Sequence, residues 1–138
     1  MIIIQNTLMN TRRLFLVDDD MDEQWIFNTA LCALDPTIEL SGAANGQDAI
    51  RQLASSHSVP DVIFLDLNMP VMNGLECLRL IKSNPGLSGI PTIIYSTSAD
   101  PLTISKTMEM GAEDFITKPY NFEDLVNTLR HVLDRIVA

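Results

Sequence analysis

Four short apolar runs recur along the chain, and each is followed by a polar residue that can take part in chemistry. The runs cover residues 14–17, 62–65, 92–95 and 114–117. The residues that follow them are Asp18 with Asp19, Asp66, Ser96 and Lys118. Runs of this length that are rich in β-branched and aromatic residues are typical of fully buried parallel strands. Because ligands of open parallel sheets bind beyond the carboxyl ends of the strands, we expect these residues to meet at one sheet edge.

Helical patterns separate the apolar runs. Helical spacing of apolar residues, bounded by Pro, Gly and Asn, covers residues 21–34, 47–55, 74–83, 101–110 and 122–136. Asp100 and Asn121 are expected to cap the starts of the last two helices. In the first segment the apolar residues at helical spacing, expected to face the core, are Ile26, Ala30, Ala33 and Leu34, with Phe27 and Leu31 beside them. A weaker strand, 38–43, follows that segment. Strict alternation predicts a parallel sheet with right-handed crossovers and helices on both faces. We expect one domain over residues 11–138, after a disordered or loosely packed tail of residues 1–10.

Composition narrows the classes of function. A chain of 138 residues can bury enough surface to fold without disulfides or metals. Its net charge of -9, with no Lys/Arg cluster larger than Arg12-Arg13, argues against nucleic-acid and anionic-membrane partners. The absence of a transmembrane-length run or signal-peptide pattern predicts the cytoplasm. Cys32 and Cys77 lie in apolar stretches and are expected in the core, whereas His57 and His131 are expected at the surface.

The residues at the strand ends favour phosphoryl chemistry. Close carboxylates raise one another's pKa values unless a cation lies between them. Oxygen ligands without His or Cys suit Mg²⁺, which also accepts phosphate oxygens. A carboxylate such as Asp66 can attack a phosphoryl group to give an aspartyl phosphate. The Lys118 ammonium and the Ser96 hydroxyl can each donate to a phosphoryl oxygen. Taken singly, each residue also fits a turn or surface position, and only the combination favours a site. Lys118 precedes Pro119, so this bond could also be cis.

A family resemblance covers residues 12–136. The residues that carry it are Asp18-Asp19, the loop 66–70 with Gly74, Ser96, and Gly111-Ala112 before Lys118-Pro119. In their joint order and spacing they resemble the receiver domain of two-component response regulators. The resemblance implies a flavodoxin-like fold with strand order 2-1-3-4-5. It also implies that Asp66 accepts a phosphoryl group from a histidine kinase or a histidine phosphotransfer protein. No enzymatic activity is expected beyond the protein's own phosphorylation and dephosphorylation.

The resemblance also implies individual roles for site residues. The residues expected to hold Mg²⁺ are Asp18, Asp19, Asp66 and the backbone carbonyl of Asn68, with Asp18 acting through water. Lys118 is expected to contact the phosphoryl group, and Ser96 and Phe115 are expected to form the switch. Thr97 stands where the family often has Ala, and its larger side chain could slow access of phosphodonors and water to Asp66.

The expected output is a binding event. No output module follows Ile136, so we expect a stand-alone receiver whose change is read by an unidentified protein. A homodimer through the face of helix 101–110 is an alternative. The charges that could serve such a dimer, Lys106, Asp114 and Arg130, have a simpler interpretation as solvated surface residues.

Three other functions fit the sequence less well. A phosphatase of the haloacid dehalogenase type needs an acid two residues after its nucleophile, where this chain has Asn68. A flavin module would place a phosphate beside the acidic residues 18–20, which would repel it. A degenerate receiver that binds partners without phosphorylation is disfavoured by Asp66 and Lys118, because both are present.

Overall fold

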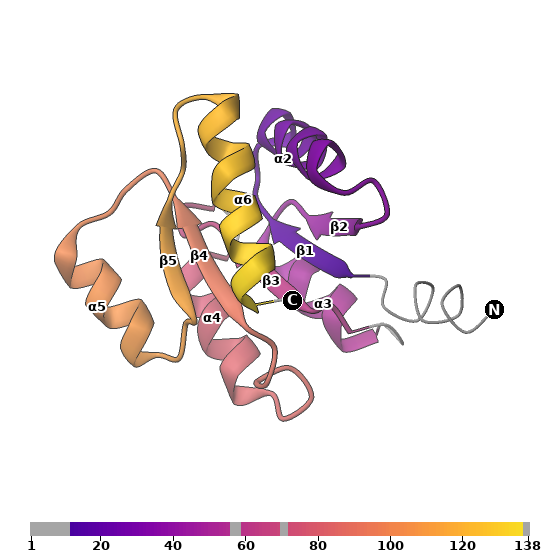
Figure 1. Ribbon diagram of the computed structural model, residues 1–138. Coiled ribbons are helices and arrows are strands. Elements are labelled where there is room, and N and C mark those ends of the chain that lie inside the picture. The colour runs from indigo at the N-terminus through magenta and orange to yellow at the C-terminus, as the bar shows by residue number, and fades with distance from the viewer. Residues whose placement is uncertain (1–11, 56–58, 70–71, 137–138) are drawn as a thin grey trace.

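The computed structural model describes residues 12–55, 59–69 and 72–136. One sheet of five parallel strands has the order β2-β1-β3-β4-β5 (Figure 1). In chain order the strands are β1 Arg13–Val17, β2 Glu39–Ala43, β3 Val62–Leu65, β4 Thr92–Ser96 and β5 Asp114–Thr117. The alternating helices are α2 Met21–Leu34, α3 Gly46–Ser55, α4 Gly74–Ser83, α5 Pro101–Glu109 and α6 Phe122–Ile136. The predicted flavodoxin-like fold and strand order are thereby confirmed.

The sheet is covered on both faces because successive strand residues point to opposite sides. In β1, Leu14 and Leu16 pack with α2 and α6, whereas Phe15 and Val17 pack with α3 and α4. Figure 1 shows α6 in front of the sheet and α4 behind it. A strand buried on both faces is expected to be apolar at every position. All four residues of β3 are apolar and buried.

Side-chain caps begin several of the helices where the sequence predicts them. Asp100 accepts a hydrogen bond from the Thr103 N–H at 3.0 Å and is followed by proline at the start of α5. Asn121 accepts one from the Asp124 N–H at 2.8 Å at the start of α6. Gly111, at φ +104°, follows α5 and supplies the left-handed conformation that glycine adopts readily.

Helix α2 buries a different face from the expected one. Its buried residues are Phe27, Ala30 and Leu31, whereas Ile26 is 40% exposed and Ala33 is also exposed. The helix therefore turns one stripe, spaced three and four residues apart, toward the core. Cys32 lies beside that stripe and is exposed, so the prediction that it is a core residue was wrong. The prediction for Cys77, which is buried, is confirmed.

Strand β5 is less buried than predicted. Its first three residues are half-buried and Thr117 is exposed. The reason is position, because β5 lies at the edge of the sheet with β4 as its only strand neighbour. Among the described residues every peptide bond is trans, so the Lys118–Pro119 bond does not take the cis form that the sequence allows.

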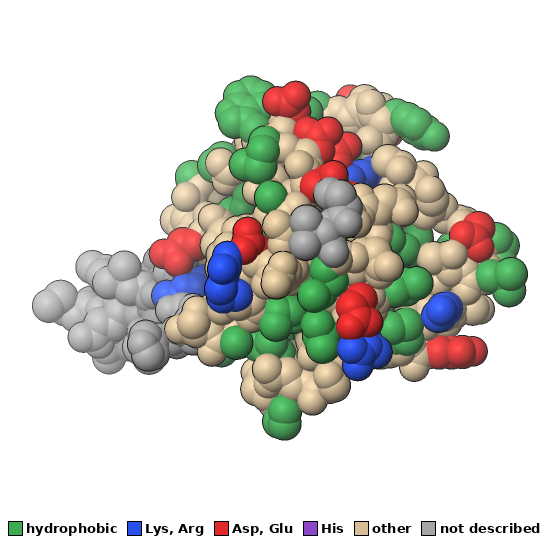
Figure 2. Space-filling model, turned by 180° about the vertical axis from the view of Figure 1, so that it is seen from behind, with side chains coloured by type: hydrophobic (Ala, Val, Ile, Leu, Met, Phe, Trp, Pro, Cys, Tyr) green, Lys and Arg blue, Asp and Glu red, His purple; other side chains and the backbone are tan. Residues whose placement is uncertain are grey.

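The distribution of basic side chains on the surface agrees with the lack of a large Lys/Arg cluster in the sequence. On the face shown in Figure 2, Lys and Arg side chains lie in small groups interspersed with acidic ones. His131 is exposed as predicted, whereas His57 and the predicted tail lie outside the described residues. Within the part of the chain that the structure describes, no helix has the length and apolar character needed to cross a bilayer.

The start of α4 lies tightly against the loop that follows β3. The N–H of Gly74 donates to the Leu67 carbonyl at 2.9 Å. A Cβ at this position would lie 2.4 Å from the Asp66 carbonyl oxygen and 2.5 Å from the Leu67 Cα. Gly74 therefore lets the helix approach the backbone that carries Asp66.

We predict that Gly74→Ala destabilises the protein, because the new methyl group meets backbone atoms that cannot yield. The expected loss is about 1–3 kcal/mol in the free energy of unfolding, measured by chemical denaturation. Gly89→Ala is the matched control, since a Cβ there meets nothing within 4 Å. Equal stability of the two variants would contradict this account of the Asp66 loop.

Candidate functional site

Backbone hydrogen bonds align the ends of the strands at one edge of the sheet. Val17 pairs with Leu65 in the register of β1 and β3, so Asp18 and Asp66 follow neighbouring positions. The Asp66 N–H donates to the Val17 carbonyl at 3.0 Å. The Lys118 N–H donates to the Ser96 carbonyl at 2.8 Å. The predicted meeting of these residues at one edge is thus built into the strand register.

Three carboxylates form an acidic cluster at this edge. Oxygens of Asp18, Asp19 and Asp66 all lie within 4.8 Å of one another. Asp18 and Asp66 are buried, and Asp19 is exposed. Only oxygen donors are present in this cluster, which suits a hard divalent cation. Asp19 is the member that solvent reaches directly.

Backbone N–H groups hold the two buried carboxylates in place. The Asp20 N–H donates to Asp18 Oδ1 at 2.9 Å, and the Asn68 N–H donates to Asp66 Oδ1 at 3.2 Å. Both bonds join a residue to the residue two positions earlier, so each carboxylate is fixed by its own following loop. The described structure thus brings Asn68 into the site through its N–H, while a role for its carbonyl stays a prediction.

Lys118 is the cation of the site and has three carboxylate partners. Its Nζ lies 2.9 Å from Asp18 Oδ2 and 3.3 Å from Asp66 Oδ2. The third partner is Glu23, on the first turn of α2, at close contact. Since β4 lies between β5 and β3, the Lys118 side chain must cross the end of β4 to reach Asp66.

Burial and charge act in opposite directions on these groups. Burial raises the pKa of Asp18, against the Asp20 N–H and Lys118, which lower it. Burial also raises the pKa of Asp66, against the charge of Lys118. Burial alone would lower the pKa of Lys118, but Glu23, Asp18 and Asp66 raise it above its ordinary value. Lys118 therefore stays charged, and the site keeps an excess of negative charge that can attract a cation.

The other predicted site residues surround this cluster. Ser96 is buried, and its Oγ accepts a hydrogen bond from the Ser98 N–H at 3.3 Å. Thr97 is exposed, and Phe115 is half-buried against the core on the α3 and α4 side. Within the described ranges, the side chains of these three residues make no hydrogen bond or ion pair to the carboxylates or to Lys118. Their switch and access roles stay predictions.

Three residues of the site were missed in the sequence. Glu23 looks like an acid that complements a helix N-terminus, and only the fold brings it to Lys118, 95 positions away. Tyr95 looks like an ordinary strand residue, but Lys118 Nζ lies 5.5 Å from the centre of its ring. Gln24 donates to the carbonyls of Asp18 at 2.7 Å and Ala43 at 3.1 Å, which ties the ends of β1 and β2 together.

Comparisons with known proteins agree with this geometry. Residues 14–130 match the family described as response regulator receiver domain. A protein-glutamate methylesterase/protein-glutamine glutaminase of Halalkalibacterium halodurans is 41% identical over 115 residues. That match covers 80% of this chain and 32% of the relative, so the chain spans about a third of its length.

Two solved structures are similar over nearly the whole chain. The phosphorylated cyanobacterial phytochrome response regulator RcpA has a TM-score of 0.85 and 28% identity, covering 93% of this chain and 95% of its own. The Mn²⁺-bound response regulator Rcp1 has a TM-score of 0.80 and 26% identity, covering 90% and 93%. With the acidic cluster and its lysine at the carboxyl edge of the sheet, these matches show that the chain belongs to the response regulator receiver domain family.

Proposed function

We propose that this protein is a phosphorylation-activated switch in which Asp66 accepts a phosphoryl group. The donor is the phosphohistidine of a sensor kinase or a histidine phosphotransfer protein. The observation that carries the proposal is the position of Asp66, which is buried at the end of β3 with Lys118 Nζ 3.3 Å from its carboxylate. A nucleophile held on a strand end beside a fixed cation is suited to in-line phosphoryl transfer.

The transfer step follows from the chemistry of these groups. An Asp66 oxygen forms a bond to phosphorus while the bond from phosphorus to the histidine nitrogen breaks. The electron pair stays on that nitrogen, which takes up a proton. Lys118 donates to a phosphoryl oxygen as negative charge develops there. Because its raised pKa keeps Lys118 charged, the donor is ready before the phosphoryl group arrives.

The acidic cluster fits the divalent cation that the family implies. Its donors are carboxylate oxygens within 4.8 Å, without a sulfur or imidazole ligand among them. We propose that Asp18, Asp19, Asp66 and the Asn68 carbonyl hold Mg²⁺, with Asp18 acting through water. When bound, Mg²⁺ supplies positive charge to the phosphoryl oxygens. The similar response regulator Rcp1 has been solved with Mn²⁺ bound, which supports a divalent metal here.

The proposed readout begins at the ends of β4 and β5. Ser96 would turn its hydroxyl to the phosphoryl group, and Phe115 would follow into the space that this opens. The Lys118 N–H bond to the Ser96 carbonyl joins these strand ends, so a shift in one reaches the other. A shift of this kind selects a conformation that is already accessible. A separate protein, not yet identified, would read the changed surface.

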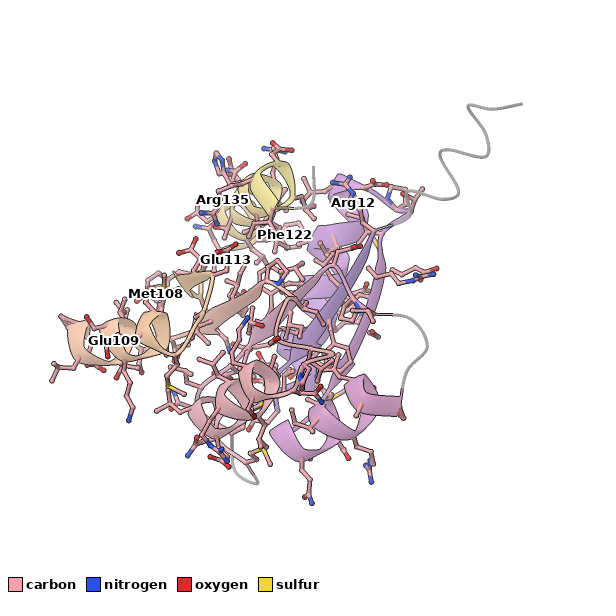
Figure 3. All side chains as sticks on the ribbon, turned by 90° about the horizontal axis from the view of Figure 1, so that it is seen from below. Arg12, Met108, Glu109, Glu113, Phe122 and Arg135 are labelled. Atoms are coloured by element: carbon pink, nitrogen blue, oxygen red, sulfur yellow. The ribbon has the colours of Figure 1, made fainter. Side chains whose placement is uncertain are left out.

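The proposed homodimer through α5 gains little support from surface charges. Figure 3 shows α5, with Met108 and Glu109 labelled, projecting from the side of the sheet. Asp114, one of the charges considered for a dimer, pairs with Arg135 of α6 in the same chain at 2.7 Å. Asp114 therefore already has a charged partner within its own chain. A cytoplasmic location is part of the proposal, and the free thiols of Cys32 and Cys77 are compatible with a reducing compartment.

Phosphorylation of Asp66 can be tested by intact mass. Wild type incubated with Mg²⁺ and acetyl phosphate should gain one phosphoryl group, and Asp66→Asn should gain none. Chelation with EDTA should abolish the wild-type adduct, because the cation would no longer offset the charge of the cluster. An adduct on the variant, or none on wild type with Mg²⁺, would contradict the proposal and favour a receiver that works without phosphorylation.

Thr97→Ala tests whether this side chain limits access to Asp66. Removing its bulk should speed loss of the phosphoryl group roughly twofold to tenfold, or less than about 1.4 kcal/mol in the barrier. The decay of the phosphorylated mass after donor removal measures this rate. Thr128→Ala on α6 serves as the control. If the Thr97 variant decays at the wild-type rate or more slowly, Thr97 does not restrict access.

Lys118→Met tests the electrostatic account at two pH values, in EDTA. Leaving Asp18 and Asp66 without their cation should cost about 3–5 kcal/mol of unfolding free energy at pH 8. The loss should be smaller at pH 5. In the wild-type protein, burial raises the pKa of the Asp18 carboxyl to about 6, so protonation of Asp18 stabilises the folded state. That contribution is full below the unfolded pKa of 3.8 and is lost as the pH rises through the folded value. Without Lys118 the pKa of Asp18 in the folded protein rises further. The loss of unfolding free energy in Lys118→Met therefore grows between pH 5 and pH 8.

Chemical denaturation at both pH values measures the effect of losing Lys118. Lys106→Met removes an exposed charge from α5 and should change stability little at either pH. A Lys118→Met deficit that is equal at pH 5 and pH 8 would show that the carboxylates do not carry the effect.

A further inference from the structure

Glu23 takes up the last donor of Lys118. A lysine ammonium carries three N–H donors. In this structure it contacts three carboxylates: Asp18 at 2.9 Å, Asp66 at 3.3 Å and Glu23 at close range. Asp18 and Asp66 come from strand ends, whereas Glu23 comes from the first turn of α2. Every donor of the cation that should receive a phosphoryl oxygen therefore already has a carboxylate partner.

The three partners differ in how easily they can leave. The Asp18 side chain is 0% exposed and the Asp66 side chain 7%, whereas that of Glu23 is 37% exposed. A buried carboxylate without its cation is strongly disfavoured, but a partly exposed one can exchange the ion pair for water. Glu23 is therefore the partner that Lys118 can lose at the lowest cost.

A phosphoryl group on Asp66 would bring additional negative charge to the same ammonium that Glu23 contacts. Its oxygens are strong acceptors that carry close to two negative charges at neutral pH. They would attract Lys118 and repel any carboxylate that remains in contact with it. The contact of Lys118 with Glu23 thus disfavours a full contact of Lys118 with the phosphoryl group. The reverse also holds.

We propose that Glu23 competes with the phosphoryl group for Lys118 and is released when Asp66 is phosphorylated. This inference rests on the proposed function and adds a residue to it. Glu23 acts through Lys118 and is a positioning residue. In the unphosphorylated protein it holds the ammonium toward α2, and it thereby opposes phosphorylation.

Release of Glu23 would also change the surface beside the site. Glu23 and Lys118 line a cavity of about 370 Å³ together with Ile26 and residues 119–122. Their ion pair joins the start of α2 to the connection between β5 and α6. Ile26 and Phe122, on the two sides of this junction, are 40% and 45% exposed. Breaking the ion pair therefore removes one contact between the start of α2 and the β5–α6 connection, beside these two exposed apolar side chains.

Glu23→Gln should speed phosphorylation by acetyl phosphate in Mg²⁺. The expected gain in the apparent second-order rate constant is about twofold to fivefold, corresponding to the loss of a partly exposed ion pair. Glu23→Asp keeps the charge but withdraws the carboxylate by about 1.5 Å, so it should give a smaller gain. A purely structural role for Glu23 predicts a slower reaction instead, because a disturbed site reacts less well.

Asp22→Asn is the matched control for charge. Asp22 precedes Glu23 on the same turn, is exposed, and its side chain makes no hydrogen bond or ion pair within the described ranges. It should react at the wild-type rate. If Asp22→Asn gains as much as Glu23→Gln, the effect is one of net charge and the proposal fails. It also fails if Glu23→Gln reacts at or below the wild-type rate while wild type is still modified on Asp66. Loss of modification in wild type would instead overturn the proposed function.

Discussion

The site depends on one ammonium among buried carboxylates. Asp18 and Asp66 lie almost fully out of solvent at the ends of β1 and β3, where an unpaired carboxylate would be strongly disfavoured. Two backbone N–H groups satisfy part of their hydrogen-bonding capacity, and among the described residues only Lys118 brings an opposite charge. Without it, these strand ends would have to bind a cation, take up protons or expose their acids to water.

This constraint explains features of the fold that look unrelated. Lys118 follows β5 and Asp66 follows β3, so the two start points are separated by two strand spacings, roughly 10 Å. Only a long side chain can cover that distance across the end of β4. The residue at the end of β4 is the small Ser96, and the ring of Tyr95 lies 5.5 Å from the ammonium. Small size at the crossing point and an aromatic ring near the charge both favour this path.

The strand ends could be predicted because they follow from general rules. Apolar runs mark buried strands, alternation with helices makes the strands parallel, and parallel strands present their carboxyl ends at one edge. Asp18, Asp66 and Lys118 were found in this way. Glu23 was not, because an acid on the first turn of a helix has a sufficient local explanation. Its contact with Lys118 depends on how α2 is rotated against the sheet.

That rotation also explains the errors at Cys32 and Ile26. The apolar residues of α2 extend around more of the helix than the core accepts, so the sequence did not distinguish the buried stripe from its neighbours. Burial of β5 was overestimated for a related reason. Phe115 and Ile116 in its middle are as apolar as the residues of an inner strand, and the strand order shows that β5 lies at the edge.

Lys118 is proposed to turn its charge toward a phosphoryl group on Asp66. A crystal structure of the protein with Mg²⁺ and beryllofluoride, which imitates a phosphoryl group, tests this most directly. We expect beryllium on an Asp66 oxygen, a fluorine that accepts a hydrogen bond from Lys118 Nζ, and no remaining contact between Lys118 and Glu23. Beryllofluoride on another side chain, or a Lys118 that makes no contact with it, would contradict the account.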